Sequence, residues 1–166
     1  MIPPFRQEAL TRGQRLGKVY EISARATSSA PPESVWRLLA DVETWSDWAD
    51  FDSAELERPA DDGGQGVGAI RRFKRRGLIT RERVIAAHEP AWLSYELLSG
   101  LPISSYSADV TLIPTDDGGT EIRWSSWCRG RFPVPGGLMR GVLERFVRAT
   151  AAGLARAAER APAATR

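Results

Sequence analysis

The single histidine, His88, is the first candidate for acid–base or nucleophilic chemistry, because imidazole exchanges protons near neutral pH. It lies in residues 86–90 (AAHEP), where the proline and the end of an apolar run predict a turn. Turns run over the protein surface, so we expect a structural or solvent-exposed histidine. A Ser-His-Asp or Cys-His arrangement would need His88 to meet a nucleophile inside a cavity, and no spacing in the sequence supports one.

Metal, phosphate and cofactor chemistry have no matching sequence pattern. Cys128 is the only cysteine, so neither an intramolecular disulfide nor a cysteine metal cluster can form. The glycine-rich residues 63–68 (GGQGVG) lead into a predicted strand, whereas a phosphate loop leads into a helix. We therefore expect no metal and no cofactor. The lone cysteine and the absence of a signal-peptide pattern predict a cytoplasmic protein.

Aromatic and polar side chains are the stronger candidates, because they suit a site that binds an apolar molecule. Alternation along the later strands predicts inward-facing hydroxyl, indole and thiol groups at Tyr95, Tyr106, Trp124, Ser126 and Cys128. Their polar atoms could orient the carbonyl groups of a ligand. A hydrogen-bonded core tyrosine would have the same sequence pattern, so both interpretations stay open.

Helical segments supply further candidate pocket residues. A short segment after the first helix carries Trp45, Trp48 and Phe51. The apolar stripe of the last predicted helix carries Met139, Val142 and Phe146. Pocket walls and plain cores share this composition, so Trp45 is compatible with either role.

The run Arg71 to Arg76 (RRFKRR) is the one basic cluster. On a β-hairpin it would form a solvated rim, and the alternative is an anionic partner such as an acyl-carrier protein, membrane headgroups or RNA. The whole chain has 23 basic and 21 acidic residues, a net charge of only +2. A single aromatic residue lies within the run, so we expect no nucleic-acid binding.

The elements that position these residues form an α+β pattern. Alternation and turn signals predict strands at about 19–27, 53–58, 67–75, 78–87, 91–99, 103–114 and 119–129. Pro31 and Pro32 begin a helix with an apolar stripe, and residues 41–50 continue as a second short helical segment. After the break at 133–137, apolar residues repeat every three or four positions and predict an amphipathic helix of about 22 residues.

A seven-stranded antiparallel sheet needs a cover for its buried face, and only the long C-terminal helix is large enough. We therefore expect a helix-grip fold, in which a curved sheet wraps around that helix. The two short helices would close one end and leave a cavity between sheet and helix.

Length and composition fit one domain. The chain has 166 residues, 42% of them hydrophobic and 27% charged, and contains no uncharged run that could span a membrane. We place the domain at 19–160, after an N-terminal extension at 1–18 and before a flexible tail at 161–166, because both ends lack a sustained period.

Residues 30–48 (APPESVWRLLADVETWSDW) resemble the APxxVWxLLxDxxxWxxW signature of the START-like, Bet v 1-like (SRPBCC) superfamily, in particular its polyketide cyclase/dehydrase group. Residues 118–124 (GGTEIRW) are similar to a motif of bacterial polyketide aromatase/cyclases. Residues 99–103 (SGLPI) look like those of uncharacterised actinobacterial members. The resemblance covers residues 19–160 and implies the helix-grip fold.

The resemblance also implies roles for two residues. Trp45 aligns with a tryptophan that contributes to the pocket of the cyclases. Arg83 falls about where those enzymes place an arginine that binds a keto or enolate oxygen, which makes it the candidate catalytic residue. If Val84 faces inward, however, strand alternation places Glu82 inside and Arg83 in solvent.

We expect the cavity to bind a hydrophobic or aromatic small molecule, and an enzyme of this kind would cyclise or dehydrate a polyketide-like substrate. One alternative is a non-catalytic carrier or sensor of a lipid, quinone or sterol-like ligand. Another is a protein-interaction module of the same fold, because one fold hosts many functions. The sequence carries no signal for the oligomeric state.

Overall fold

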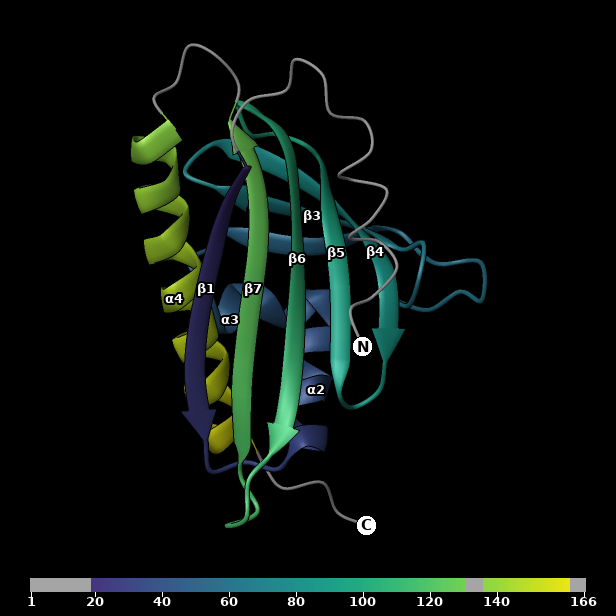
Figure 1. Ribbon diagram of the computed structural model, residues 1–166. Coiled ribbons are helices and arrows are strands. Elements are labelled where there is room, and N and C mark those ends of the chain that lie inside the picture. The colour runs from purple at the N-terminus through teal and green to yellow at the C-terminus, as the bar shows by residue number, and fades with distance from the viewer. Residues whose placement is uncertain (1–18, 131–135, 162–166) are drawn as a thin grey trace.

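Seven antiparallel strands form one sheet that is covered on one face by helices (Figure 1). The computed structural model describes residues 19–130 and 136–161. The strands are β1 (Val19–Ser28), β2 (Ser53–Arg58), β3 (Ile70–Arg75), β4 (Leu78–His88), β5 (Trp92–Ser99), β6 (Ile103–Pro114) and β7 (Thr120–Gly130). They lie in the order β1-β7-β6-β5-β4-β3-β2, so β1 forms one edge of the sheet beside the last strand β7, and β2 forms the other edge.

The register of the sheet separates an inner from an outer row of side chains. Tyr95 pairs with Val84 on one side and with Ala108 on the other, and all three side chains are buried. One residue along, Glu96 pairs with Arg83, whose side chain is exposed. Because side chains alternate along each strand, this register fixes which residues reach the helix-covered face.

The short helices connect β1 to β2. Helix α2 (Pro32–Ala40) begins with a proline in its first turn and buries Val35, Trp36 and Leu39. The 3-10 helix η1 (Val42–Thr44) and helix α3 (Trp45–Trp48) follow directly. The predicted second helical segment at 41–50 is therefore present as these two short pieces.

The long helix α4 (Gly136–Arg160) packs along β1 and β7 and contacts α2 and α3. At Gly153, α4 closely approaches α3: a Cβ atom there would lie 2.1 Å from the carbonyl oxygen of Trp48. A residue without a side chain is required for α3 to lie this close to α4.

The predicted fold is confirmed: a seven-stranded antiparallel sheet holds a long C-terminal helix with two short helices after β1. Strand β3 begins at Ile70, three residues later than predicted, because 66–69 form turns. The predicted extension at 1–18 and most of the tail at 161–166 lie outside the described residues. Within the described part of the chain, no helix has both the length and the apolar character needed to cross a bilayer.

Candidate ligand cavity

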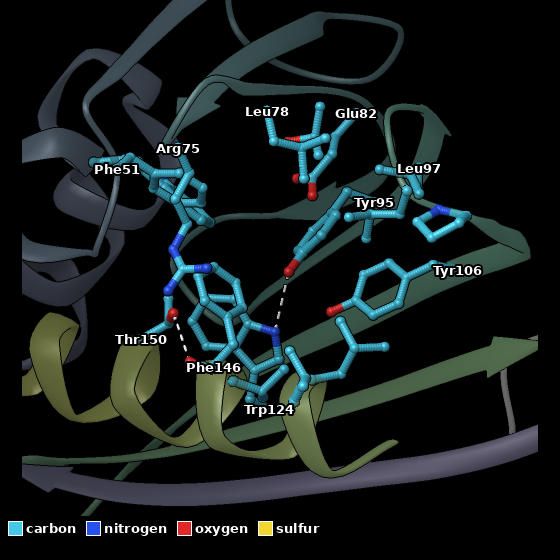
Figure 2. A pocket seen from close by; sticks show the side chains of 17 residues that line it. Phe51, Arg75, Leu78, Glu82, Tyr95, Leu97, Tyr106, Trp124, Phe146 and Thr150 are labelled. Atoms are coloured by element: carbon cyan, nitrogen blue, oxygen red, sulfur yellow. Dashed lines mark hydrogen bonds between the residues drawn. The ribbon is translucent and has the colours of Figure 1, made fainter. Parts of the chain in front are cut away.

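A cavity of about 270 Å³ lies between the inner face of the sheet and the first half of α4 (Figure 2). Side chains from α3, from strands β3 to β7 and from α4 form its wall, which is mostly aromatic and aliphatic. The lining residues are Trp45, Phe51, Arg75, Leu78, Thr80, Glu82, Tyr95, Leu97, Leu101, Pro102, Tyr106, Trp124, Val142, Leu143, Phe146, Val147 and Thr150.

Aromatic rings in mutual contact form one side of the wall. The ring centroids of Trp45 and Trp124 lie 6.0 Å apart in an edge-to-face arrangement. The ring centroids of Phe51 and Phe146 lie 5.6 Å apart in the same arrangement. Trp45 and Trp124 are each 2% exposed. Such pairs hold their geometry by packing, and they offer flat apolar surfaces to a planar ligand.

Two tyrosine hydroxyls provide polar atoms in this wall. The indole Nε1 of Trp124 donates a hydrogen bond of 3.1 Å to the hydroxyl of Tyr95, and the hydroxyls of Tyr106 and Ser126 lie 3.0 Å apart. Burial raises the pKa of both tyrosines, so their hydroxyls stay protonated. Each can therefore donate a hydrogen bond across the whole physiological pH range.

Glu82 is the acidic residue of the wall. It comes from the inner face of β4, and its carboxyl group points into the cavity toward the hydroxyl of Tyr95 (Figure 2). Its Oε2 atom is buried and has no hydrogen-bond partner. Burial raises the pKa of this carboxyl to about 8, although the nearby Arg71 cation acts to lower it. The group therefore holds its proton at neutral pH.

Arg71 lies behind Glu82 on the neighbouring strand β3 and is fully buried. Its guanidinium donates hydrogen bonds to the carbonyl oxygens of Leu39 (3.5 Å) and Ala40 (3.0 Å) at the end of α2, where a cation is favoured. It also lies over the ring of Trp45, 5.7 Å from the centroid. Burial lowers its pKa to about 10, so it remains a cation at neutral pH.

The entrance of the cavity is apolar with one charged pair. Leu78 and Val142 line the cavity and are 46% and 44% exposed, so they lie where it opens to solvent. Arg75 donates a hydrogen bond of 2.9 Å from Nε to Asp50 and lies over the ring of Phe146. An apolar ligand can enter here without passing a desolvated charge.

Most of the sequence-derived pocket residues meet in this wall, namely Trp45, Phe51, Tyr95, Tyr106, Trp124, Val142 and Phe146. Trp48 and Ser126 lie behind it: the ring of Trp48 packs 4.7 Å from that of Trp45, and Ser126 bonds the Tyr106 hydroxyl. The side chain of Met139 lies outside the described residues. The roles of all these residues in binding stay predictions.

Arg83, the candidate catalytic residue, lies outside the cavity on the outer face of the sheet. Its side chain is exposed, and its Nε donates a hydrogen bond of 3.0 Å to Glu96 across the strand pair. The physical reason is strand parity: Val84 is fully buried, so its neighbour Arg83 must point outward and Glu82 inward. Arg83 therefore cannot reach a ligand in this cavity.

The basic cluster is divided by the same alternation. Arg71 and Phe73 are buried, so the expectation of a wholly solvated rim is wrong for Arg71. Arg72, on the outer face, pairs with Glu55, whereas Arg75 lies on the inner face at the entrance of the cavity and pairs with Asp50. These contacts give no support to a surface built for an anionic partner such as an acyl-carrier protein.

Sequence analysis gave Glu82 as the inward alternative to Arg83, and it missed Arg71 as a site residue. The signal for Arg71 is the same as for Glu82, a charged residue two positions before a buried one, Phe73 for Arg71 and Val84 for Glu82. His88 is exposed at the end of β4 and does not line the cavity. In the part of the chain that the structure describes, no group of histidine, cysteine and acidic residues is arranged to hold a metal.

Comparisons with known proteins agree with this architecture. Residues 20–159 match the model of the family described as polyketide cyclase / dehydrase and lipid transport. A START superfamily protein from Mycobacterium smegmatis superposes with a TM-score of 0.73 at 16% identity, covering 84% of this chain and 97% of its own.

Two further solved structures share the fold. Protein XoxI from Bacillus cereus has a TM-score of 0.68 at 16% identity, with 82% of this chain and 94% of its own covered. Ara h 8.0201 has a TM-score of 0.63 at 19% identity, with 86% and 96% covered. A sequence search of curated proteins found no match. The family model spans nearly all described residues, and the chain therefore belongs to the polyketide cyclase / dehydrase and lipid transport family.

Proposed function

We propose that this protein binds a hydrophobic, ring-containing small molecule in the cavity between the sheet and α4. The observation that carries the proposal is the wall itself, a concave aromatic and aliphatic surface with a few polar atoms at one side. Ligand sites have this character: apolar surface supplies most of the affinity, and a few polar groups set the orientation. A cavity of about 270 Å³ suits a ligand of two or three fused rings.

Blocking the entrance tests the proposal. Val142→Trp places a large side chain where the cavity opens, and Leu138→Trp is its matched control, because Leu138 is 64% exposed on the same helix and does not line the cavity. The fluorescence of N-phenyl-1-naphthylamine, a neutral aromatic dye, reports its transfer into an apolar site. We expect the wild type and Leu138→Trp to bind the dye and Val142→Trp to bind it at least tenfold more weakly. Equal binding by both variants would refute this site.

Conversion of the ligand is a second candidate function, and the buried carboxyl of Glu82 is the observation that favours it. A carboxyl group that holds its proton at neutral pH can donate it to a ketone oxygen and so assist an aldol-type cyclisation or a dehydration. The cavity would contribute by holding a flexible polyketide-like chain in a reactive conformation. Turnover of a linear poly-β-ketone by the dye-binding protein would distinguish conversion from carriage or sensing.

A further inference from the structure

The polar atoms of the cavity are concentrated on three neighbouring strands. Glu82 comes from β4, Tyr95 from β5 and Tyr106 from β6, and these three residues line the same cavity (Figure 2). Tyr95 and Tyr106 are 3% and 7% exposed. Among the described residues of α4, those that line the cavity are Val142, Leu143, Phe146, Val147 and Thr150. The Thr150 hydroxyl donates its hydrogen bond to the carbonyl oxygen of Phe146. A bound molecule therefore meets its main polar contacts on one side.

The hydrogen bonds among the indole and hydroxyl groups on this side do not use all of their polar hydrogens. The indole of Trp124 and the hydroxyls of Tyr95, Tyr106 and Ser126 carry one polar hydrogen each. Two hydrogen bonds join these groups, one from Trp124 to Tyr95 and one between Tyr106 and Ser126. Each bond uses one hydrogen, so these two bonds leave two hydroxyl hydrogens, and one of them is that of Tyr95. The Tyr95 hydroxyl can rotate to turn this hydrogen toward the cavity.

The charge at this side is positive when Glu82 is protonated. The ionisable groups that face Glu82 are Arg71 from β3, Tyr95 from β5 and Tyr106 from β6, and Arg75 lies at the entrance, paired with Asp50. The tyrosines are neutral and Arg71 is a buried cation. A protonated Glu82 adds a second hydrogen-bond donor and removes the carboxylate charge that acts most strongly on Arg71, leaving that of Asp41. Both effects favour the negative end of a ligand dipole.

We infer that the cavity selects ring-containing ligands with a carbonyl oxygen, such as a ketone or a quinone, and that Glu82 and Tyr95 donate hydrogen bonds to that oxygen. This inference rests on the proposed function. Such an oxygen supplies an acceptor for the hydroxyl hydrogen of Tyr95 and for the proton of Glu82. A hydrocarbon of the same shape would leave the buried donors unpaired. Ionised Glu82 would present only acceptors and would repel the carbonyl oxygen.

A matched pair of probes tests this inference. Fluorenone and fluorene share one ring skeleton and differ by the carbonyl oxygen, and each is titrated as a competitor of N-phenyl-1-naphthylamine. At pH 6.5 we expect fluorenone to bind roughly threefold to tenfold more tightly, the usual effect of one hydrogen bond. This preference should fall toward unity above pH 8.5, where Glu82 is ionised. Glu82→Gln keeps an N–H donor and should preserve the preference at both pH values.

The control variant is Glu96→Gln, which removes a carboxylate from the outer face and should behave as the wild type. Equal affinity for fluorenone and fluorene at pH 6.5 would overturn the inference and leave the proposed function intact. A preference of the wild type for fluorenone that is unchanged between pH 6.5 and 8.5 would also overturn the inference and leave the proposed function intact. Failure of the dye and both probes to bind would overturn the proposed function itself. The wild-type measurements decide the matter even if a variant does not fold.

Discussion

Glu82→Gln should make the protein more stable at alkaline pH, because it removes a buried carboxyl group that must ionise there. The native state holds the Glu82 proton up to about pH 8, whereas an unfolded chain releases it near pH 4.5. Between these values the native state binds more protons than the unfolded state, so the free energy of unfolding of the wild type falls as the pH rises.

The magnitude follows from that interval. Each pH unit between the two pKa values lowers the free energy of unfolding by about 1.4 kcal/mol. Between pH 5.5 and 7.5 the wild type should therefore lose about 3 kcal/mol relative to Glu82→Gln. The free energy of unfolding of a domain is only about 5–15 kcal/mol, so this difference is large enough to measure.

Urea denaturation at pH 5.5, 6.5, 7.5 and 8.5 checks the prediction, with tryptophan fluorescence as the signal. Hydrogen bonds or nearby cations lower the pKa values of four other acids, Asp50, Glu57, Asp117 and Glu121. The stability that these acids contribute is lost only at acidic pH. They are common to both proteins and cancel in the comparison. Glu96→Gln serves as a control with the same change of charge. Parallel stability curves for the wild type and Glu82→Gln would refute a neutral buried carboxyl.

Two further predictions concern residues around the site, one the packing of α4 and one the charge next to Glu82. Gly153→Ala should destabilise the protein by about 1–3 kcal/mol, because its Cβ would lie 2.1 Å from the Trp48 carbonyl oxygen. Gly141→Ala in the same helix meets no atom within 4 Å and should stabilise by up to about 1 kcal/mol; thermal unfolding compares the two. Arg71→Met should raise the pKa of Glu82 further, because the cation that lowers it is gone. The pH at which stability stops falling in the denaturation series should then move upward.

The fold follows from sequence patterns that are strong and local. Tyr106, Ala108, Val110 and Leu112 alternate without interruption, and the structure pairs them along β7 as a half-buried strand requires. The helix after 136 has a clear apolar period. Patterns of this kind depend only on which residues face the core, and they need no knowledge of neighbouring strands.

The charged part of the site could not be predicted in this way. Residues 78–83 hold two apolar, one hydroxyl and three charged side chains, so alternation alone does not say which face is buried. The pairing of Val84 with Tyr95 decides it, and that pairing is a property of the assembled sheet. Arg71 was hidden for a related reason: within a basic run, one buried arginine has the same sequence signature as its solvated neighbours.

Burial of the Arg71 and Glu82 side chains destabilises the fold, and this destabilisation supports a role for them in the cavity. Apolar side chains of similar volume in place of a buried charged pair are often neutral or stabilising. Arg71 offsets part of its burial cost through the carbonyl groups at the end of α2. Glu82 gains only the attraction of the Arg71 cation, because its buried Oε2 atom has no hydrogen-bond partner, and it avoids a buried charge by keeping its proton. A ligand oxygen that accepts this proton in a hydrogen bond would complete the group, so the same residue that weakens the empty protein would strengthen the complex.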